Sequence, residues 1–156
     1  MRREITLPSC AKVNLSLKIT GKREDGYHDI ETIFQAIDLL DYISIEITED
    51  AGITISCSKH TLPIDSSNLC WKAAEAFQKT FNVNKGIAIR IEKNIPVSAG
   101  LGGGSSNAAA TLLGLAKLFD VEKEKLFPLA AELGSDVPFF LSGYSTARGK
   151  GRGEIL

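Results

Sequence analysis

A run of glycine and hydroxyl residues, SAGLGGGSSN at 98–107, separates an apolar segment that alternates with period two from an alanine-rich segment. Glycines accept positive φ and leave room beside the backbone, so successive amide groups can turn toward one point. The alanine-rich segment predicts a helix, whose first amides have no intrahelical partner and whose dipole is positive at that end. These features predict a phosphate-binding site, with Ser105 and Ser106 as additional hydrogen-bond donors.

Two well-known phosphate loops do not fit this segment. A P-loop requires a lysine followed by serine or threonine after its last glycine, whereas the sequence after Gly104 reads SSN. A dinucleotide-binding loop requires G-x-G-x-x-G, but residues 100–105 have a serine in the last position and Asp120 matches the expected acidic residue only loosely. The other alternative is a connection whose glycines only permit close helix packing. The two hydroxyls at the helix start favour a phosphate cradle over that alternative.

Five other residues could do chemistry, and each also has an ordinary structural explanation. Lys12 and Asn14 lie on the polar side of an alternating segment, where a lysine is usually solvated. Tyr27 and His28 follow a turn, where an aromatic ring and an imidazole are commonly exposed. Asp136 lies just before Val-Pro, where a carboxylate often caps the next helical turn. Spacing alone leaves both explanations open for each of them.

The elements that position these residues follow from hydrophobic periodicity. Alternation over 12–20, with Val13, Leu15, Leu17 and Ile19 on one side, predicts a half-buried strand. Further strands are predicted at 29–39, 42–48, 52–58 and 86–95. Helical spacing predicts helices over 66–81, after the glycine loop, and over 122–134, where Pro128 must kink the helix or begin it. Strands followed by helices indicate one α+β domain.

Composition narrows the classes of function. Eighteen basic and nineteen acidic side chains give a formal charge of −1, so no overall field would recruit nucleic acid or an anionic membrane. The cysteines Cys10, Cys57 and Cys70 form no paired motif and are expected to be reduced thiols. No apolar run reaches the length of a membrane span. We therefore expect a cytoplasmic protein that binds neither nucleic acid nor membrane.

Three segments carry a resemblance to a known family. The segment PVSAGLGGGSSNAAA at 96–110 resembles the ATP loop of the GHMP kinases. In the same order as in that family, 11–32 and 133–141 are similar to the members that phosphorylate a cytidyl diphosphate sugar alcohol. The resemblance implies that residues 1–156 are a GHMP-kinase N-terminal domain, a mixed β-sheet covered by helices on one side. It also implies a C-terminal GHMP domain outside these residues, so we expect contact with that domain or a homo-dimer.

The resemblance also implies roles for individual residues. Asp136 would be the catalytic base and Lys12 its cationic partner, which would offset negative charge during phosphoryl transfer. Asn14, Tyr27 and His28 would bind the substrate, with the Tyr27 ring stacked on cytosine. Mg²⁺ would accompany ATP, with Ser106 as a metal contact. The residues implied to bind ATP are Pro96, Val97, Ser98, Ala99, Gly100, Leu101, Gly102, Gly103, Gly104, Ser105, Ser106 and Asn68.

The implied reaction transfers the γ-phosphoryl group of ATP to the 2-hydroxyl of this small-molecule substrate, a step of the non-mevalonate isoprenoid pathway. The sequence leaves two alternatives to this reaction open. The domain could bind nucleotide without catalysis, or it could be another GHMP small-molecule kinase. The Tyr27-His28 element favours the cytidyl substrate over other members of the family.

Overall fold

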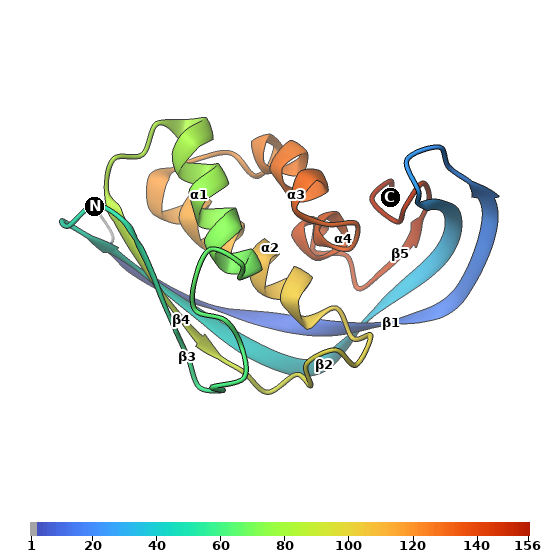
Figure 1. Ribbon diagram of the computed structural model, residues 1–156, viewed down its shortest axis with the longest axis horizontal. Coiled ribbons are helices and arrows are strands. Elements are labelled where there is room, and N and C mark those ends of the chain that lie inside the picture. Colours follow the sequence, from blue (N-terminus) through green and yellow to red (C-terminus); the bar gives the residue numbers. More distant parts are fainter. Residues whose placement is uncertain (1–2) are drawn as a thin grey trace.

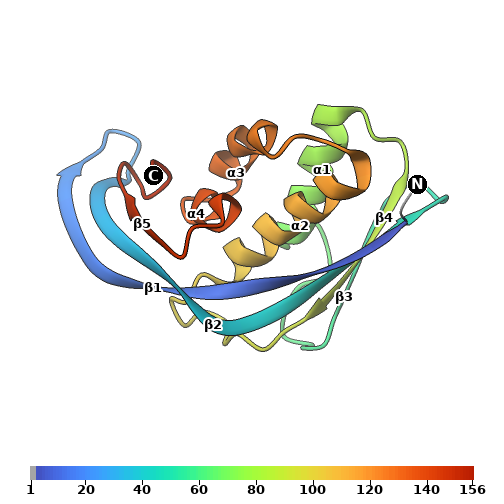
Figure 2. The same cartoon turned by 180° about the vertical axis from the view of Figure 1, so that it is seen from behind.

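The computed structural model describes residues 3–156 and consists of a five-stranded sheet with four α-helices on one of its faces (Figure 1). The opposite view shows the same layering, with the far face of the sheet free of helices (Figure 2). The elements in chain order are β1 (Glu4–Lys22), β2 (His28–Thr48), β3 (Ile53–Cys57), α1 (Leu69–Phe81), β4 (Gly86–Glu92), α2 (Gly103–Phe119), a 3₁₀ turn (Lys123–Leu126), α3 (Phe127–Leu133), α4 (Val137–Ser142) and β5 (Thr146–Gly149). The fold is therefore the α+β arrangement expected from the sequence.

The sheet has the order β1-β2-β4-β3, and β5 pairs with the first part of β2. All neighbours are antiparallel except β3 and β4, which run parallel. The core lies between this sheet and helices α1 and α2, where Ile87, Ile89 and Ile91 are buried as their alternation predicts. Gly114 brings α2 close to the sheet, because a Cβ there would lie 2.6 Å from Ile45.

Several predicted boundaries differ from the structure. The strands expected at 29–39 and 42–48 are one strand, β2, whose pairing with β1 skips Asp38 and Leu39. The strand β5 was not predicted, because its four residues TARG have no hydrophobic alternation. The third helix begins at Phe127 with Pro128 in its first turn, where proline is tolerated.

The burial expected for the alternating residues of β1 is wrong. Leu15, Leu17 and Ile19 expose 62%, 61% and 62% of their surface. A bulge between Asn14 and Ser16 inserts one residue and reverses the faces, so Leu17 lies on the same face as Asn14. That face is the one covered by helices elsewhere, but this part of β1 and β2 forms an arm that extends beyond the helices, which is why these apolar residues are exposed (Figures 1 and 2).

Candidate active site

The glycine-rich loop, residues 96–102, joins β4 to α2. Ser98, Gly100 and Gly102 have φ values of 58°, 73° and 70°, a region that glycine adopts without strain. Gly102 precedes the first residue of α2, and no side chain caps this helix. The first amides of α2 are therefore available to a ligand, together with the positive end of the helix dipole.

A pocket of about 380 Å³ lies between this loop and the start of α1. The loop, Gly103, Gly104, Ser105 and Asn107 form one side, and Leu62, Pro63, Ser67, Asn68, Leu69 and Lys93 complete the lining. Glycine backbone on one side and apolar side chains on the other suit a ligand with a phosphate group and a flat apolar part.

Asn68 combines a structural role with a place in the pocket wall. Its Oδ1 accepts a hydrogen bond from the amide of Cys70 at 2.8 Å, which caps α1, and its Nδ2 donates to the carbonyl of Pro63 at 2.8 Å. Because both side-chain atoms already have partners within the chain, Asn68 shapes the pocket chiefly by holding the start of α1.

Lys12 and Asp136, which are far apart in sequence, meet beside the loop. The Lys12 Nζ lies 3.4 Å from Asp136 Oδ2 and donates to Asn14 Oδ1 at 2.6 Å. The backbone amide of Lys12 donates to the carbonyl of Leu101 at 2.9 Å, which fixes β1 against the loop. Side-chain exposures are 8% for Lys12 and 29% for Asp136, so the lysine is not on a solvated face. Asp136 makes no capping hydrogen bond, although it directly precedes α4.

Phe34 holds this pair in place. Its ring stacks on Phe139 of α4 with centroids 4.9 Å apart, and the Lys12 Nζ lies 5.8 Å above the same ring. Asn14 is fixed from the other side, because its Nδ2 donates to Thr32 Oγ1 at 2.7 Å. The strands β1 and β2 and the helix α4 therefore fix the lysine and the carboxylate together.

Tyr27 and His28 lie at the tip of the arm and do not contact the loop. His28 is four residues before Thr32 on β2, and because side chains alternate along a strand, the two lie on the same face. Four residues of strand span about 13 Å. Arg152 lies 5.0 Å from the centre of the Tyr27 ring, and both Tyr27 and His28 are exposed. The arm thus places these two residues on the same side of the sheet as Lys12 and Asn14, at a distance from them.

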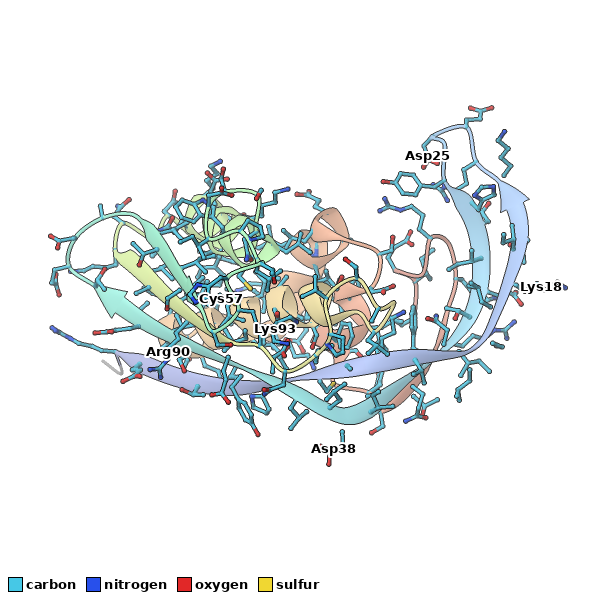
Figure 3. All side chains as sticks on the ribbon, turned by 60° about the horizontal axis from the view of Figure 1, so that its bottom comes forward. Lys18, Asp25, Asp38, Cys57, Arg90 and Lys93 are labelled. Atoms are coloured by element: carbon cyan, nitrogen blue, oxygen red, sulfur yellow. The ribbon has the colours of Figure 1, made fainter. Side chains whose placement is uncertain are left out.

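Sequence reasoning missed a buried ion pair beneath the loop, Asp41 with Lys93. Figure 3 shows Lys93 inside the molecule near the glycine loop, while Lys18 and Asp25 lie out on the arm. The hydrophobic alternation along β2 and β4 could have indicated that both residues point inward. Asp41 continues the inward series of β2, and Lys93 follows Ile91 in the inward series of β4.

Comparison with known proteins shows which class of protein the chain is similar to. Residues 68–144 match the family model "GHMP kinases N terminal domain". Together with the relatives and the solved structure described next, this match shows that the chain has the fold of a GHMP-kinase N-terminal domain. Among residues 3–156, none of the helices has the length and apolar content that crossing a bilayer requires.

The relatives carry one particular name, 4-diphosphocytidyl-2-C-methyl-D-erythritol kinase. The protein of that name from Clostridium perfringens is 48% identical over 148 residues, which are 94% of this chain and 51% of the relative. Its counterpart from Prochlorococcus marinus is 47% identical over 156 residues, which are 99% of this chain and 50% of the relative. The chain thus spans about half the length of the curated relatives it matches.

Solved structures agree with this comparison. The crystal structure of a 4-(cytidine 5'-diphospho)-2C-methyl-D-erythritol kinase has a TM-score of 0.83 at 41% identity, over 97% of this chain and 54% of that one. The mevalonate kinase of Methanococcus jannaschii has a TM-score of 0.65 at 21% identity, over 96% of this chain and 54% of that one. The second likeness concerns the fold alone.

Proposed function

We propose that this domain binds ATP at the glycine loop and provides the catalytic pair for phosphorylation of 4-diphosphocytidyl-2-C-methyl-D-erythritol on its 2-hydroxyl. The observation that carries the proposal is the pair Lys12 and Asp136, which lies against the loop that precedes α2. A lysine and a carboxylate beside uncapped helix amides suit phosphoryl transfer to a hydroxyl. The names of the relatives support the choice of substrate.

The loop fits a nucleotide in two respects. Positive φ at Gly100 and Gly102 turns the backbone so that the amides at the start of α2 stay open, and the pocket beside them has apolar walls for a base. Within residues 3–156 no group of three or more His, Cys, Asp or Glu side chains could hold a metal by itself. Mg²⁺ commonly binds through one or two carboxylates and the substrate phosphates, so Asp136 and Ser106 are the residues that would contact it.

Each residue then has a defined task. The carboxylate of Asp136 accepts the proton of the substrate hydroxyl as its oxygen attacks phosphorus. The ammonium group of Lys12, held by Asn14 and by the ring of Phe34, offsets the negative charge that develops on the transferred group. Mg²⁺, when bound with ATP, would neutralise oxygens of the β and γ phosphates. Tyr27 and His28 would bind the cytosine, by stacking and by hydrogen bonds to its edge.

Calorimetric titration of the chain with the non-hydrolysable analogue AMP-PNP and Mg²⁺, followed by a phosphoryl-transfer assay with the cytidyl substrate, tests this proposal. Binding and turnover would support both of its parts. Binding without turnover would favour a nucleotide-binding module that does not catalyse by itself. Absence of binding would contradict the assignment of the loop.

Asp136→Asn tests the catalytic pair. We expect transfer to slow by about 10²- to 10⁴-fold, the range for loss of a general base. Affinity for AMP-PNP measured without Mg²⁺ should change by less than about threefold, because the only nucleotide contact assigned to this carboxylate is through the metal. Single-turnover transfer and calorimetry measure the two quantities. An unchanged transfer rate would remove Asp136 from the mechanism.

A further inference from the structure

A chain of buried polar side chains connects the core to the start of α2. It comprises Asp41 on β2, Asn107 and Ser106 on α2, and Ser9 on β1, and none of the four exposes more than 3% of its surface. Such a chain is costly to bury unless every hydrogen bond in it is made. The role proposed for Lys12 and Asp136 does not use it.

Asp41 is the fixed end of the chain. Its Oδ1 accepts hydrogen bonds from the backbone amides of Asn94 and Ile95 at 2.6 and 2.8 Å. Its Oδ2 accepts from the ammonium group of Lys93 and from Asn107 Nδ2, the latter at 2.8 Å. The carboxylate is thus surrounded by donors and holds Asn107 in one orientation.

The direction of every hydrogen bond follows from this arrangement. Asn107 Oδ1 lies 3.3 Å from the Lys93 ammonium, and its Nδ2 faces Asp41. In a flipped amide, Nδ2 would face the Lys93 ammonium, which is also a donor, and Oδ1 would face the Asp41 carboxylate, which is also an acceptor. The same Nδ2 donates its second hydrogen to Ser9 Oγ at 2.9 Å. Ser9 already accepts there and donates its own hydrogen to Ser106 Oγ at 2.8 Å.

Ser106 Oγ therefore accepts from inside the protein and keeps its own hydrogen for another acceptor. Among residues 3–156 no such acceptor is hydrogen-bonded to it. Ser106 is the fourth residue of α2, in the first turn of a helix that follows the glycine loop and has no capping side chain. The charges of Asp41 and Lys93 offset each other. The hydrogen-bonded side chains therefore orient the Ser106 hydroxyl without adding net charge beside it.

We infer that Asp41, Asn107 and Ser9 are positioning residues, which orient the Ser106 hydroxyl so that it donates its hydrogen to a phosphate oxygen of the bound nucleotide. The inference rests on the proposed function, namely that the loop binds phosphates. It adds a role for three residues outside the loop and assigns Ser106 as a donor to an anion. A chain of aligned hydrogen bonds also strengthens its last donor.

A double-mutant cycle tests this inference. Affinities for adenosine, ADP and AMP-PNP, each with Mg²⁺, are measured by calorimetry for the unchanged chain, Ser9→Ala, Ser106→Ala and the double variant. Ser106→Ala should lower AMP-PNP affinity about tenfold or more, the size expected for a hydrogen bond to a charged group. Ser9→Ala should lower it about threefold or more, and the double variant should be no weaker than Ser106→Ala. Adenosine affinity should stay within about twofold throughout.

Thr111→Val is the matched control. The Thr111 hydroxyl is also buried on α2 but donates to the backbone carbonyl of Asn107 at 2.8 Å, outside the chain of side chains. The Thr111→Val substitution should leave the affinities for adenosine, ADP and AMP-PNP within about twofold of those of the unchanged protein. If Ser9→Ala does not fold, as judged by circular dichroism, Ser9→Cys keeps the shape with a weaker donor and enters the same cycle.

Two results would overturn the inference. One is an equal loss of adenosine and AMP-PNP affinity in Ser9→Ala, which indicates a general packing role. The other is a double variant whose loss is the product of the single losses, which indicates that Ser9 does not act through Ser106. An unchanged chain that binds adenosine as tightly as AMP-PNP would instead refute the phosphate loop itself, and this inference with it.

Discussion

At the scale of single residues, the molecule buries charge in two places and uses it differently. Lys12 meets Asp136 where the carboxylate is still 29% exposed, so a substrate can reach it. Lys93 meets Asp41 where side-chain exposures are 3% and 0%, so that pair is almost closed to solvent even though Lys93 lines the pocket beside the loop. Exposure, rather than residue type, distinguishes a group that can react from one that can only hold other groups in place.

Asp41→Asn should destabilise the fold by about 3–5 kcal/mol, because it leaves the buried Lys93 ammonium without its counter-charge. Urea unfolding followed by circular dichroism measures the change. Asp38→Asn, on the same strand, is the matched control and should change stability by less than about 0.5 kcal/mol, since Asp38 is exposed and points away from the molecule in Figure 3. A loss below about 1 kcal/mol for Asp41→Asn would contradict the structural importance of the pair.

Cys70 gives a prediction about pH. Burial raises the pKa of its thiol from 9.0 to about 12, so the folded protein keeps the proton while the unfolded chain releases it near pH 9. The folded state thus binds more protons above pH 9, and the free energy of unfolding should fall by about 1 kcal/mol per pH unit between pH 9 and 12 from this group. Unfolding of the original chain and of Cys70→Ala across that range isolates the contribution. Equal slopes for the two proteins would contradict it.

At the scale of elements, the glycine loop is held between β1 and α4. A Cβ on Gly102 would lie 2.9 Å from the Phe140 ring and 3.0 Å from Lys12 Cγ, and its φ of 70° is strained for other residues. The loop therefore depends on glycine both for its backbone conformation and for its close contact with β1 and α4.

Gly102→Ala should cost about 2–4 kcal/mol, as the sum of left-handed strain and overpacking, and should weaken AMP-PNP binding at least tenfold. Gly26→Ala is the control, because φ at Gly26 is 84° but nothing lies within 4 Å of a Cβ there. It should cost only about 1–2 kcal/mol and leave AMP-PNP affinity unchanged. Thermal unfolding and calorimetry measure both. Similar losses of affinity in the two variants would contradict the role of close packing in the loop.

At the scale of the whole molecule, the sheet connects two places that are separated in space. Strands β1 and β2 run from the glycine loop and Lys12 to the arm that presents Tyr27 and His28 (Figure 1). The arrangement separates the pocket proposed to bind nucleotide from the group proposed to recognise cytosine. Binding of the two ligands should therefore respond separately to substitution.

His28→Ala should weaken binding of the cytidyl substrate by about tenfold, the contribution of one or two hydrogen bonds. Affinity for AMP-PNP should remain within about twofold, because His28 is not part of the pocket beside the loop. Calorimetry with each ligand separates these effects. An equal loss for both ligands would contradict the assignment of His28 to the substrate.

The sequence by itself determined the α+β class, the helix that directly follows the loop and the likeness of the loop to a phosphate cradle. These follow from periodicity, glycine content and helix-start residues, which act over a few positions and need no distant partner. The inward row Ile87, Ile89 and Ile91 was predicted correctly for this reason.

Only the tertiary structure decided which of the candidate residues meet. The bulge after Asn14 reversed the exposed and inward faces of β1, because one inserted residue changes the side of every later side chain. Lys12 met Asp136 because Phe34 stacks on Phe139 and brings α4 against the sheet. Asp41 and Lys93 stood in inward positions in the sequence, but their pairing arose from the register of β2 and β4, which depends on contacts between residues distant along the chain.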